Sequence, residues 1–328
     1  MVRSSVGFRI EGGRRHLAAA ILALGLAACA TTLPPVPAAN GPPPALWVDC
    51  AGPRTERPTM VLEAGAFGTS ADWGRVAADL SRSGRVCAYD RAGQGASPPG
   101  RPPRDALTIA RELAATLDQQ GETGPVVLAG HSNGGVYAEA FAVLYPQRTA
   151  GLLYINAVGT DDLDDPVVMA ELQDEELRAK LAVIGGRLGL AGLVARGITA
   201  EMGLPPEAAH RKLAALTSAR HRLNSREEVL QIVPSLARIR ALGNVSAAIP
   251  VATIVSTWPP ETRVGRAWRT AETAPARRAC QGWVLTAPGG THVSPLGRDR
   301  AYALAALGWL GTPGLKSDPV CTGPQFRR

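Results

Sequence analysis

Short apolar runs alternate with amphipathic stretches along residues 46–158 and again along residues 245–312. The apolar runs have the length of strands and predict strands at 46–50, 59–63, 85–89, 125–129, 151–156, 250–255 and 282–286. Apolar positions at helical spacing predict helices at 70–81, 105–120, 135–145, 264–273 and 299–310. Strands that alternate with helices in this way predict an α/β fold, in which a mostly parallel sheet is covered by helices on both faces.

The pattern changes between residues 159 and 244, where no convincing strand appears. Helical stretches follow one another at 167–184, 189–195, 206–223 and 226–242. About 85 residues are too many for a simple crossover between two strands. We therefore divide the folded part into a core (46–158 and 245–312), a helical insertion (159–244) and an irregular tail (313–328).

The sequence Gly-His-Ser-Asn-Gly at residues 130–134 lies between a predicted buried strand and a predicted helix. In that context G-x-S-x-G forms a sharp turn that exposes a serine. Glycines at its two ends avoid collisions with the neighbouring strand and helix. The turn is expected to present the hydroxyl of Ser132 at the carboxyl edge of the sheet. It also leaves the backbone N–H of Asn133 at a helix N-terminus, where it can bind an oxyanion.

The first 28 residues are typical of an export signal. Four arginines precede a run of about 12 apolar residues, which is too short to span a bilayer as a helix. The run ends in Leu-Ala-Ala-Cys at residues 26–29, which looks like a bacterial lipoprotein box with Cys29 as the lipidated residue. A proline-rich linker, 29–45, follows as a spacer. We expect an exported protein anchored to membrane lipid through Cys29; a plain signal peptide with a chance cysteine is the alternative.

The formal net charge is +7, and the four arginines and one glutamate of the first 28 residues contribute +3 of it. The other arginines are scattered and do not interleave with aromatic residues, which favours a solvated basic surface over nucleic-acid binding. Four cysteines follow Cys29, without a Cys-x-x-Cys pair or a Cys/His cluster, so we expect no metal site. In an oxidising compartment this even number predicts two disulfides.

Four ordered segments resemble the α/β-hydrolase superfamily: residues 62–65 (LEAG), 89–97 (YDRAGQGAS), 130–135 (GHSNGG) and 288–292 (PGGTH). They follow the family's order and spacing over about residues 46–312. The resemblance implies an α/β-hydrolase fold with a nucleophile after the fifth family strand, a histidine after the last strand and a helical cap inserted after the sixth. It also implies that Asp90, in the second segment, has a structural role.

The family's strand order places the strands of Cys50 and Cys87 side by side, so the resemblance implies a Cys50–Cys87 disulfide. Cys280 precedes the last core strand, and Cys321 lies in a tail that needs tethering. We therefore expect Cys280–Cys321 as the second disulfide.

A serine hydroxyl becomes a good nucleophile only when a base takes its proton, and histidine is the usual base. Of the five histidines, one lies in the signal and one adjoins Ser132 in the turn. His210 and His221 lie in charged helices of the insertion, where we expect them at the surface. His292, in a loop after the last strand, is therefore the predicted base.

An acid is expected to orient this histidine. The family places the acid after the seventh strand or, in some members, after the sixth. Glu261 lies about where the first arrangement requires it, and the chain order Ser, Glu, His agrees with the family's. After the sixth strand the usual carboxylate position holds Asn156, so Asp161 and Asp162 are the alternatives.

The second oxyanion donor is expected in the small-residue loop 64–68, with the backbone N–H of Ala66 as first choice and that of Phe67 as second. We predict a cofactor-free serine hydrolase that cleaves a small-molecule acyl ester through an acyl-enzyme on Ser132. Acyl transfer, an aminopeptidase-like reaction or a non-catalytic binding protein with the same fold are the alternatives. Serine at the nucleophile position argues against epoxide hydrolases and haloalkane dehalogenases, whose family patterns place a carboxylate there.

Overall fold

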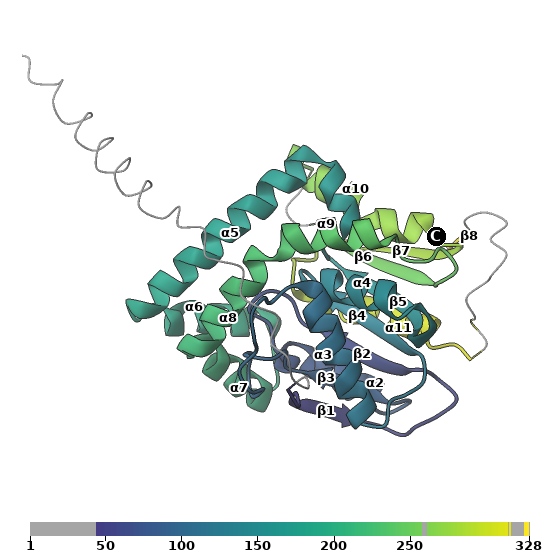
Figure 1. Cartoon of the computed structure of the whole chain (residues 1–328), viewed down its shortest axis with the longest axis horizontal. Helices are drawn as coiled ribbons and strands as arrows, with labels where there is room; N and C mark the ends of the chain where they lie inside the picture. Colours follow the sequence, from purple (N-terminus) through teal and green to yellow (C-terminus); the bar gives the residue numbers. More distant parts are fainter. Residues whose placement is uncertain (1–43, 258–260, 314, 316–324, 328) are drawn as a thin grey trace, which may run out of the picture. The chain divides into compact units, whose positions relative to one another are not determined.

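The computed structural model describes residues 44–257, 261–313, 315 and 325–327. These residues belong to one compact unit, Ala39–Arg328, which is built on a single sheet (Figure 1). Its strands are β1 (Val48–Ala51), β2 (Thr59–Glu63), β3 (Val86–Tyr89), β4 (Val126–His131), β5 (Thr149–Ile155), β6 (Val251–Ser256), β7 (Gln281–Ala287) and β8 (Gln325–Arg327). Their order is β1-β3-β2-β4-β5-β6-β7-β8. Only β1 runs antiparallel to its neighbour among these described strands, so the predicted mostly parallel α/β-hydrolase sheet is confirmed.

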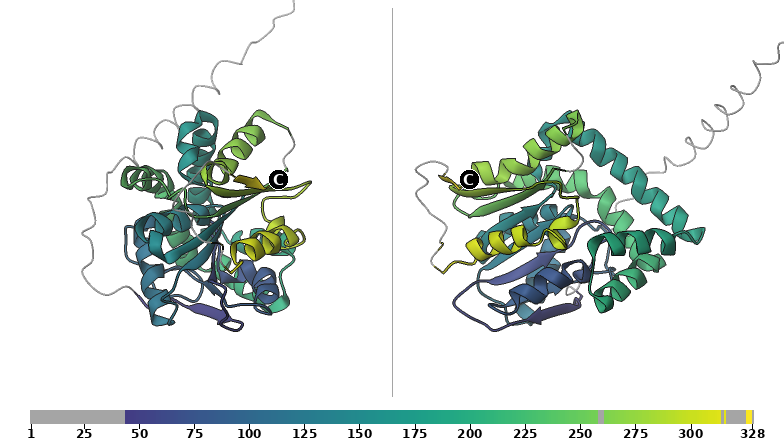
Figure 2. Two further views of the ribbon diagram at one scale, coloured as in Figure 1. Left: turned by 90° about the vertical axis from the view of Figure 1, so that its right-hand side faces the viewer. Right: turned by 180° about the vertical axis from the view of Figure 1, so that it is seen from behind.

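Helices cover both faces of the sheet and bury two separate apolar clusters. One face carries α3 (Ala106–Gln119), α4 (Gly134–Leu144), α9 (Ile232–Leu242) and α10 (Arg263–Arg278). The other face carries η1 (Ser70–Trp73), α2 (Gly74–Leu80) and α11 (Ala301–Leu310), which lie in front of the sheet in the right-hand view of Figure 2. Burial on both faces explains why β3, β4 and β6 are buried at every position and mostly apolar, without a strict alternation of apolar and polar residues.

The residues between β5 and β6 are helical, as predicted. They form η3 (Thr160–Asp164), α5 (Pro166–Arg187), α6 (Ala191–Met202), α7 (Pro206–Thr217), α8 (Ala219–Leu230) and α9. Figure 1 shows α5, α6, α7 and α8 gathered on one side of the sheet, and we call these four helices the cap. Strand β5 corresponds to the family's sixth strand, after which the resemblance placed the helical cap. Helix α9 packs on the core, against α4 and α3.

The prediction of a single helix at 206–223 is wrong, because the chain breaks at Ser218. That residue is extended, and its hydroxyl accepts a hydrogen bond from the backbone N–H of His221 at the start of α8. A serine that caps a new helix replaces the missing intrahelical partner there. The tail also differs from the prediction, because β8 pairs in parallel with β7. Among the described residues no helix is both long and apolar enough to cross a bilayer.

The predicted Cys50–Cys87 disulfide is confirmed. The two cysteines face each other across the antiparallel β1–β3 pair, with their Cα atoms 4.0 Å apart. Cys280 is buried at the start of β7, but Cys321 lies outside the described residues. The Cys280–Cys321 disulfide therefore stays a prediction.

Candidate active site

The turn between β4 and α4 has the predicted geometry of a nucleophile elbow. Ser132 adopts a left-handed backbone conformation, with φ of 55°, and its N–H donates to the carbonyl of Ile155 on the next strand. A Cβ atom at Gly134 would lie 2.5 Å from the carbonyl oxygen of Glu63, so only glycine fits there. A left-handed serine is a costly conformation that surrounding structure must impose, which is typical of functional turns.

Ser132 and His292 line the same cavity, of about 550 Å³, between the cap and the carboxyl ends of β4, β5 and β6. Helix α5 of the cap and helix α10 of the core form its walls, with Phe67, Val158 and Trp268 among the apolar residues. Among the described residues no hydrogen bond joins the Ser132 hydroxyl to the His292 ring. Such contacts often tighten only when a substrate binds.

His292 is held in place by hydrogen bonds to its backbone carbonyl. The side-chain amide of Asn156 donates to this oxygen over 2.9 Å, and Nε2 of His131 lies 2.9 Å from it. Asn156 also bonds both the backbone N–H and the hydroxyl of Ser256, so one amide joins the ends of β5 and β6 to the histidine loop. From the sequence, Asn156 could be recognised only as the absence of a carboxylate, because the groups it positions lie far away along the chain.

The two histidine rings lie 4.8 Å apart between centroids. Burial lowers the pKa of His131 to about 4, so that this imidazole is neutral near neutral pH. The surrounding protein and the neighbouring His131 also lower the pKa of His292 below its usual range, although its ring remains accessible from the cavity. An unprotonated His292 is in the state that a general base requires.

The structure does not bring Glu261 to His292. The Glu261 side chain is 71% exposed, and its carboxylate lies 2.5 Å from Arg269 and 3.8 Å from Arg266, both on α10. It is not among the residues that line the cavity. The carboxylate that acts electrostatically on the pKa of His292 belongs to Glu201 of the cap. Glu261 as the triad acid is therefore an untested sequence prediction that the described contacts do not support.

The alternative acids are also engaged elsewhere. Asp161 forms an ion pair with Arg278. Asp162 is buried and accepts a hydrogen bond of 2.9 Å from the backbone N–H of Gly159, and burial raises its pKa to about 7. Neither side chain contacts His292 in the part of the chain that the structure describes. Their contacts stabilise the start of the insertion.

The predicted oxyanion loop passes directly beside the nucleophile. A Cβ atom at Gly65 would lie 2.9 Å from Cβ of Ser132, so the loop needs glycine for this close approach. Phe67 is left-handed, with φ of 53°. The backbone N–H groups of Ala66, Phe67 and Asn133 have no hydrogen-bond partner among the described residues. Unused N–H groups beside a nucleophile are what an oxyanion hole consists of.

Two cap residues bind this loop at the backbone carbonyl of Phe67. Nζ of Lys212 on α7 donates to that oxygen over 2.9 Å, and Nε2 of His221 on α8 lies 3.2 Å from it. Lys212 is also paired with the buried carboxylate of Asp72 at 2.8 Å. The expectation of a surface position for His221 is wrong, because only 1% of this residue is exposed. Its neighbours in the fold, not in the sequence, account for its burial.

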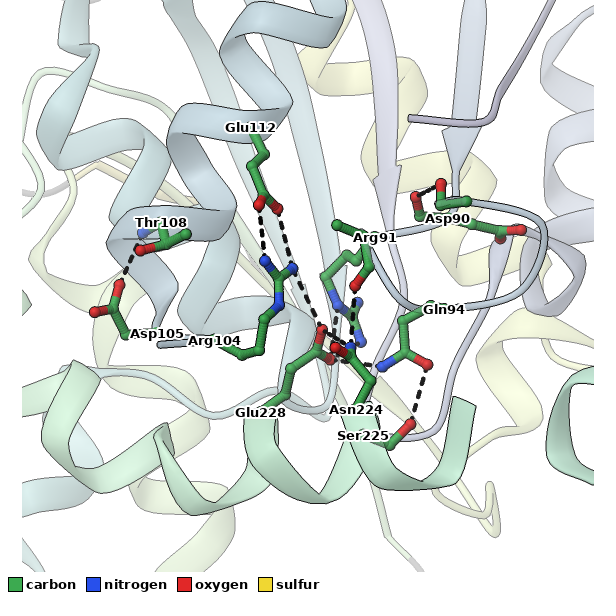
Figure 3. Close-up of polar contacts among 12 residues, drawn as sticks. Asp90, Arg91, Gln94, Arg104, Asp105, Thr108, Glu112, Asn224, Ser225 and Glu228 are labelled. Atoms are coloured by element: carbon green, nitrogen blue, oxygen red, sulfur yellow. Dashed lines mark hydrogen bonds and ion pairs between the residues drawn. The ribbon is translucent and has the colours of Figure 1, made fainter. Parts of the chain in front are cut away.

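Arg91 also binds this loop, and only 1% of its side chain is exposed. Its guanidinium donates to the carbonyls of Ala64 and Gly65 at 2.6 and 2.9 Å, and it pairs with Glu63 at 2.6 Å. The same group pairs with Glu228 of cap helix α8 at 2.9 Å (Figure 3). In a trans peptide the N–H points away from the carbonyl. Arg91 therefore turns the N–H of Ala66 away from itself and fixes that orientation.

The turn that carries Arg91 has the structural role that the resemblance implied for Asp90. The Asp90 carboxylate accepts hydrogen bonds of 2.8 Å from the backbone N–H groups of Ser70 and Ala96. Gln94 extends the turn toward the cap, where its amide donates to Glu228 and accepts from the hydroxyl of Ser225 (Figure 3). The turn thus joins the core to the cap beside the nucleophile.

The fold and this site define an α/β-hydrolase, and the comparison with known families agrees. The model described as the alpha/beta hydrolase family matches residues 60–306. Because this match covers most of the chain, the protein belongs to that family. It is therefore a hydrolase by family and by fold.

Individual proteins resemble this chain only at low sequence identity. The chain is 31% identical over 121 residues to a putative carbamate hydrolase, RutD, of Azorhizobium caulinodans, a match that covers 37% of this chain and 44% of that one. The malate-bound structure of a thermophilic esterase from Thermogutta terrifontis has a TM-score of 0.60 at 22% identity, over 81% of this chain and 94% of that one. A putative epoxide hydrolase from Pseudomonas aeruginosa has a TM-score of 0.61 at 20% identity, over 82% and 92%.

The sequence relatives and the solved structures each support a limited conclusion. The chain spans between 14% and 64% of the length of its curated relatives. At 22% identity or less, the structural matches show the fold alone.

Proposed function

We propose that the protein is a serine esterase that forms an acyl-enzyme on Ser132. The observation that carries this proposal is a left-handed Ser132 in an elbow that lines one cavity with His292. His292 takes the proton of the hydroxyl as Ser132 attacks the acyl carbonyl. The N–H groups of Asn133 and Ala66 stabilise the oxyanion, and His292 returns the proton to the leaving alcohol. Water then attacks the acyl-enzyme with the help of His292 and releases the acid.

The identity of the nucleophile favours acyl transfer over other chemistry of this family. A carboxylate nucleophile forms the intermediates of epoxide hydrolases, and this chain has serine at that position. One of the sequence relatives is described as a putative carbamate hydrolase, and a carbamate is an acyl substrate. A panel of p-nitrophenyl esters, thioesters and anilides tests the proposal. We expect ester turnover, and no turnover of any acyl substrate would contradict it.

Glu261→Gln tests how His292 is oriented. A true triad acid replaced by its amide costs about 10⁴-fold in kcat. We expect a loss of less than about tenfold here, because the Glu261 carboxylate is bound to Arg269 and exposed. Asp161→Asn serves as the matched control, because it removes another of the acids considered above and Asp161 is likewise paired with an arginine. A loss of 10³-fold or more for Glu261→Gln alone would show that this carboxylate reaches His292 during turnover.

We further propose that the protein is exported and held at a membrane by a lipid on Cys29. Residues 1–43 lie outside the described part, so the support is the sequence alone: a short apolar run that ends in Leu-Ala-Ala-Cys, then a proline-rich linker. Multiple acyl chains give stable anchoring, whereas a single chain is marginal.

The wild-type protein is therefore expected in the membrane fraction after a high-salt wash, because salt weakens charge contacts but not lipid insertion. Cys29→Ser should release it as soluble protein or leave it uncleaved at this site, with unchanged esterase activity in detergent. Soluble wild-type protein with a different N-terminus would refute the anchor and leave the esterase proposal intact.

A further inference from the structure

Five charged side chains line the cavity beside Ser132: Glu171, Glu175, Arg178, Arg269 and Glu272. Both arginines already have acidic partners. Arg178 pairs with Glu171 at 3.5 Å, and Arg269 pairs with Glu261 at 2.5 Å. The positive charge of the lining is thus largely neutralised, and two carboxylates remain.

Glu272 has no hydrogen-bond or ion-pair partner among the described residues, although only 8% of it is exposed. It lies on α10 one turn beyond Trp268, and both residues line the cavity. An ionised carboxylate in such a place is costly unless a cation or hydrogen-bond donors compensate it. Burial and the nearby Asp162 accordingly raise the pKa of Glu272 well above its ordinary value, against the opposing effect of Arg269.

Glu175 lies on the opposite wall, on cap helix α5. Its carboxylate accepts a hydrogen bond of 3.2 Å from the side-chain amide of Asn133, which is a neutral donor. Burial raises the pKa of this carboxyl as well. Asn133 directly follows the nucleophile, so Glu175 lies close to the reacting centre. The substrate cavity therefore presents two carboxylates that the protein does not pair with a cation.

We propose that the cavity recognises acyl substrates that carry a cationic amino group, with Glu272 and Glu175 as the carboxylates that bind it. This inference rests on the esterase proposal above. A primary ammonium supplies a positive charge and three donors, which is what an unpartnered buried carboxylate lacks. The apolar walls at Phe67, Val158 and Trp268 fit the carbon skeleton that carries the amine.

The test compares two ethyl esters of nearly equal shape. Alanine ethyl ester and ethyl isobutyrate differ by an ammonium in place of a methyl group on the carbon next to the acyl carbonyl. Ethyl 4-aminobutyrate and ethyl pentanoate form a second pair with the charge further away. Because the ammonium also activates the ester chemically, the quantity that matters is how each variant changes the ratio of kcat/KM between the members of a pair.

We expect Glu272→Gln to lower kcat/KM for the ammonium member of at least one pair by about tenfold or more, as for the loss of a hydrogen bond to a charged group. The neutral member should change by less than about twofold. Glu175→Gln should act in the same direction. Glu176→Gln is the matched control, because Glu176 follows Glu175 on α5 but is not among the residues that line the cavity; its effect on the ratio should be small.

A second readout does not depend on turnover. Propylammonium should inhibit hydrolysis of a neutral p-nitrophenyl ester competitively, and Glu272→Gln should weaken this inhibition by a similar factor. Equal changes for both members of every pair, together with no inhibition by propylammonium, would overturn the inference and leave Glu272 as a neutral buried acid. If Ser132→Ala hydrolysed these esters as fast as the wild type, the esterase proposal itself would fail.

Discussion

Ser132→Ala should lower ester turnover by about 10³-fold or more, because the oxyanion hole and substrate binding alone supply only residual catalysis. His292→Ala should come close to the same loss. The two residues act as one unit, so the double variant should be hardly slower than either single variant. The measurement is kcat/KM for the best p-nitrophenyl ester, with the folded state of each variant checked by thermal melting.

Ser83→Ala provides the matched control, since Ser83 is an exposed serine outside the cavity. Its rate should equal that of the wild type. Near-wild-type turnover by Ser132→Ala would mean that another group performs the reaction. A large loss for Ser132→Ala with little loss for His292→Ala would instead remove His292 as the base.

The largest effect on stability is expected at Arg91. Arg91→Met should lower the free energy of unfolding by about 3 kcal/mol or more, because it leaves the buried carboxylates of Glu63 and Glu228 without their cation. It should also lower kcat of the folded enzyme, because Arg91 holds the carbonyls of Ala64 and Gly65 and so orients the oxyanion loop. Denaturant unfolding and kcat per folded molecule measure the two effects separately.

Arg104→Met separates stability from catalysis. Arg104 is equally buried and pairs with Glu112 at 2.7 Å in the same polar network (Figure 3). In the part of the chain that the structure describes, it has no hydrogen bond or ion pair with the loop at residues 64–68. It should destabilise the protein to a similar degree and leave kcat per folded molecule within about twofold. Equal losses of kcat in both variants would show that the network stabilises the fold without orienting the loop.

The sequence predicted the features that depend on local geometry. The elbow at Ser132 needs a strand, a sharp turn and a helix in succession, and all three leave a signal in residues 126–144. The Cys50–Cys87 disulfide followed from the strand order that the resemblance implied. The alternation of apolar runs with amphipathic helices was sufficient to predict the α/β sheet.

The features that arise from contacts between distant segments were not predictable. The charged sequence around His221 is typical of an exposed helix, but Phe67, 154 residues earlier, provides the carbonyl that this buried ring contacts. Asn156 looked like a missing acid because its partner carbonyl belongs to His292, 136 residues away. Glu272 lies in a polar helix, and its burial in the cavity depends on the packing of α10 against other elements, including α5 and η3, which are distant in the sequence.

Reaction with a fluorophosphonate tests the central claim most directly, because only an activated serine attacks such a probe at phosphorus. The wild type should gain one phosphonyl group, and peptide mapping should place it on Ser132. Ser132→Ala should gain none, and His292→Ala should react far more slowly. A folded wild-type protein that stays unlabelled, or that carries the label on another residue, would contradict the assignment of Ser132 as a catalytic nucleophile.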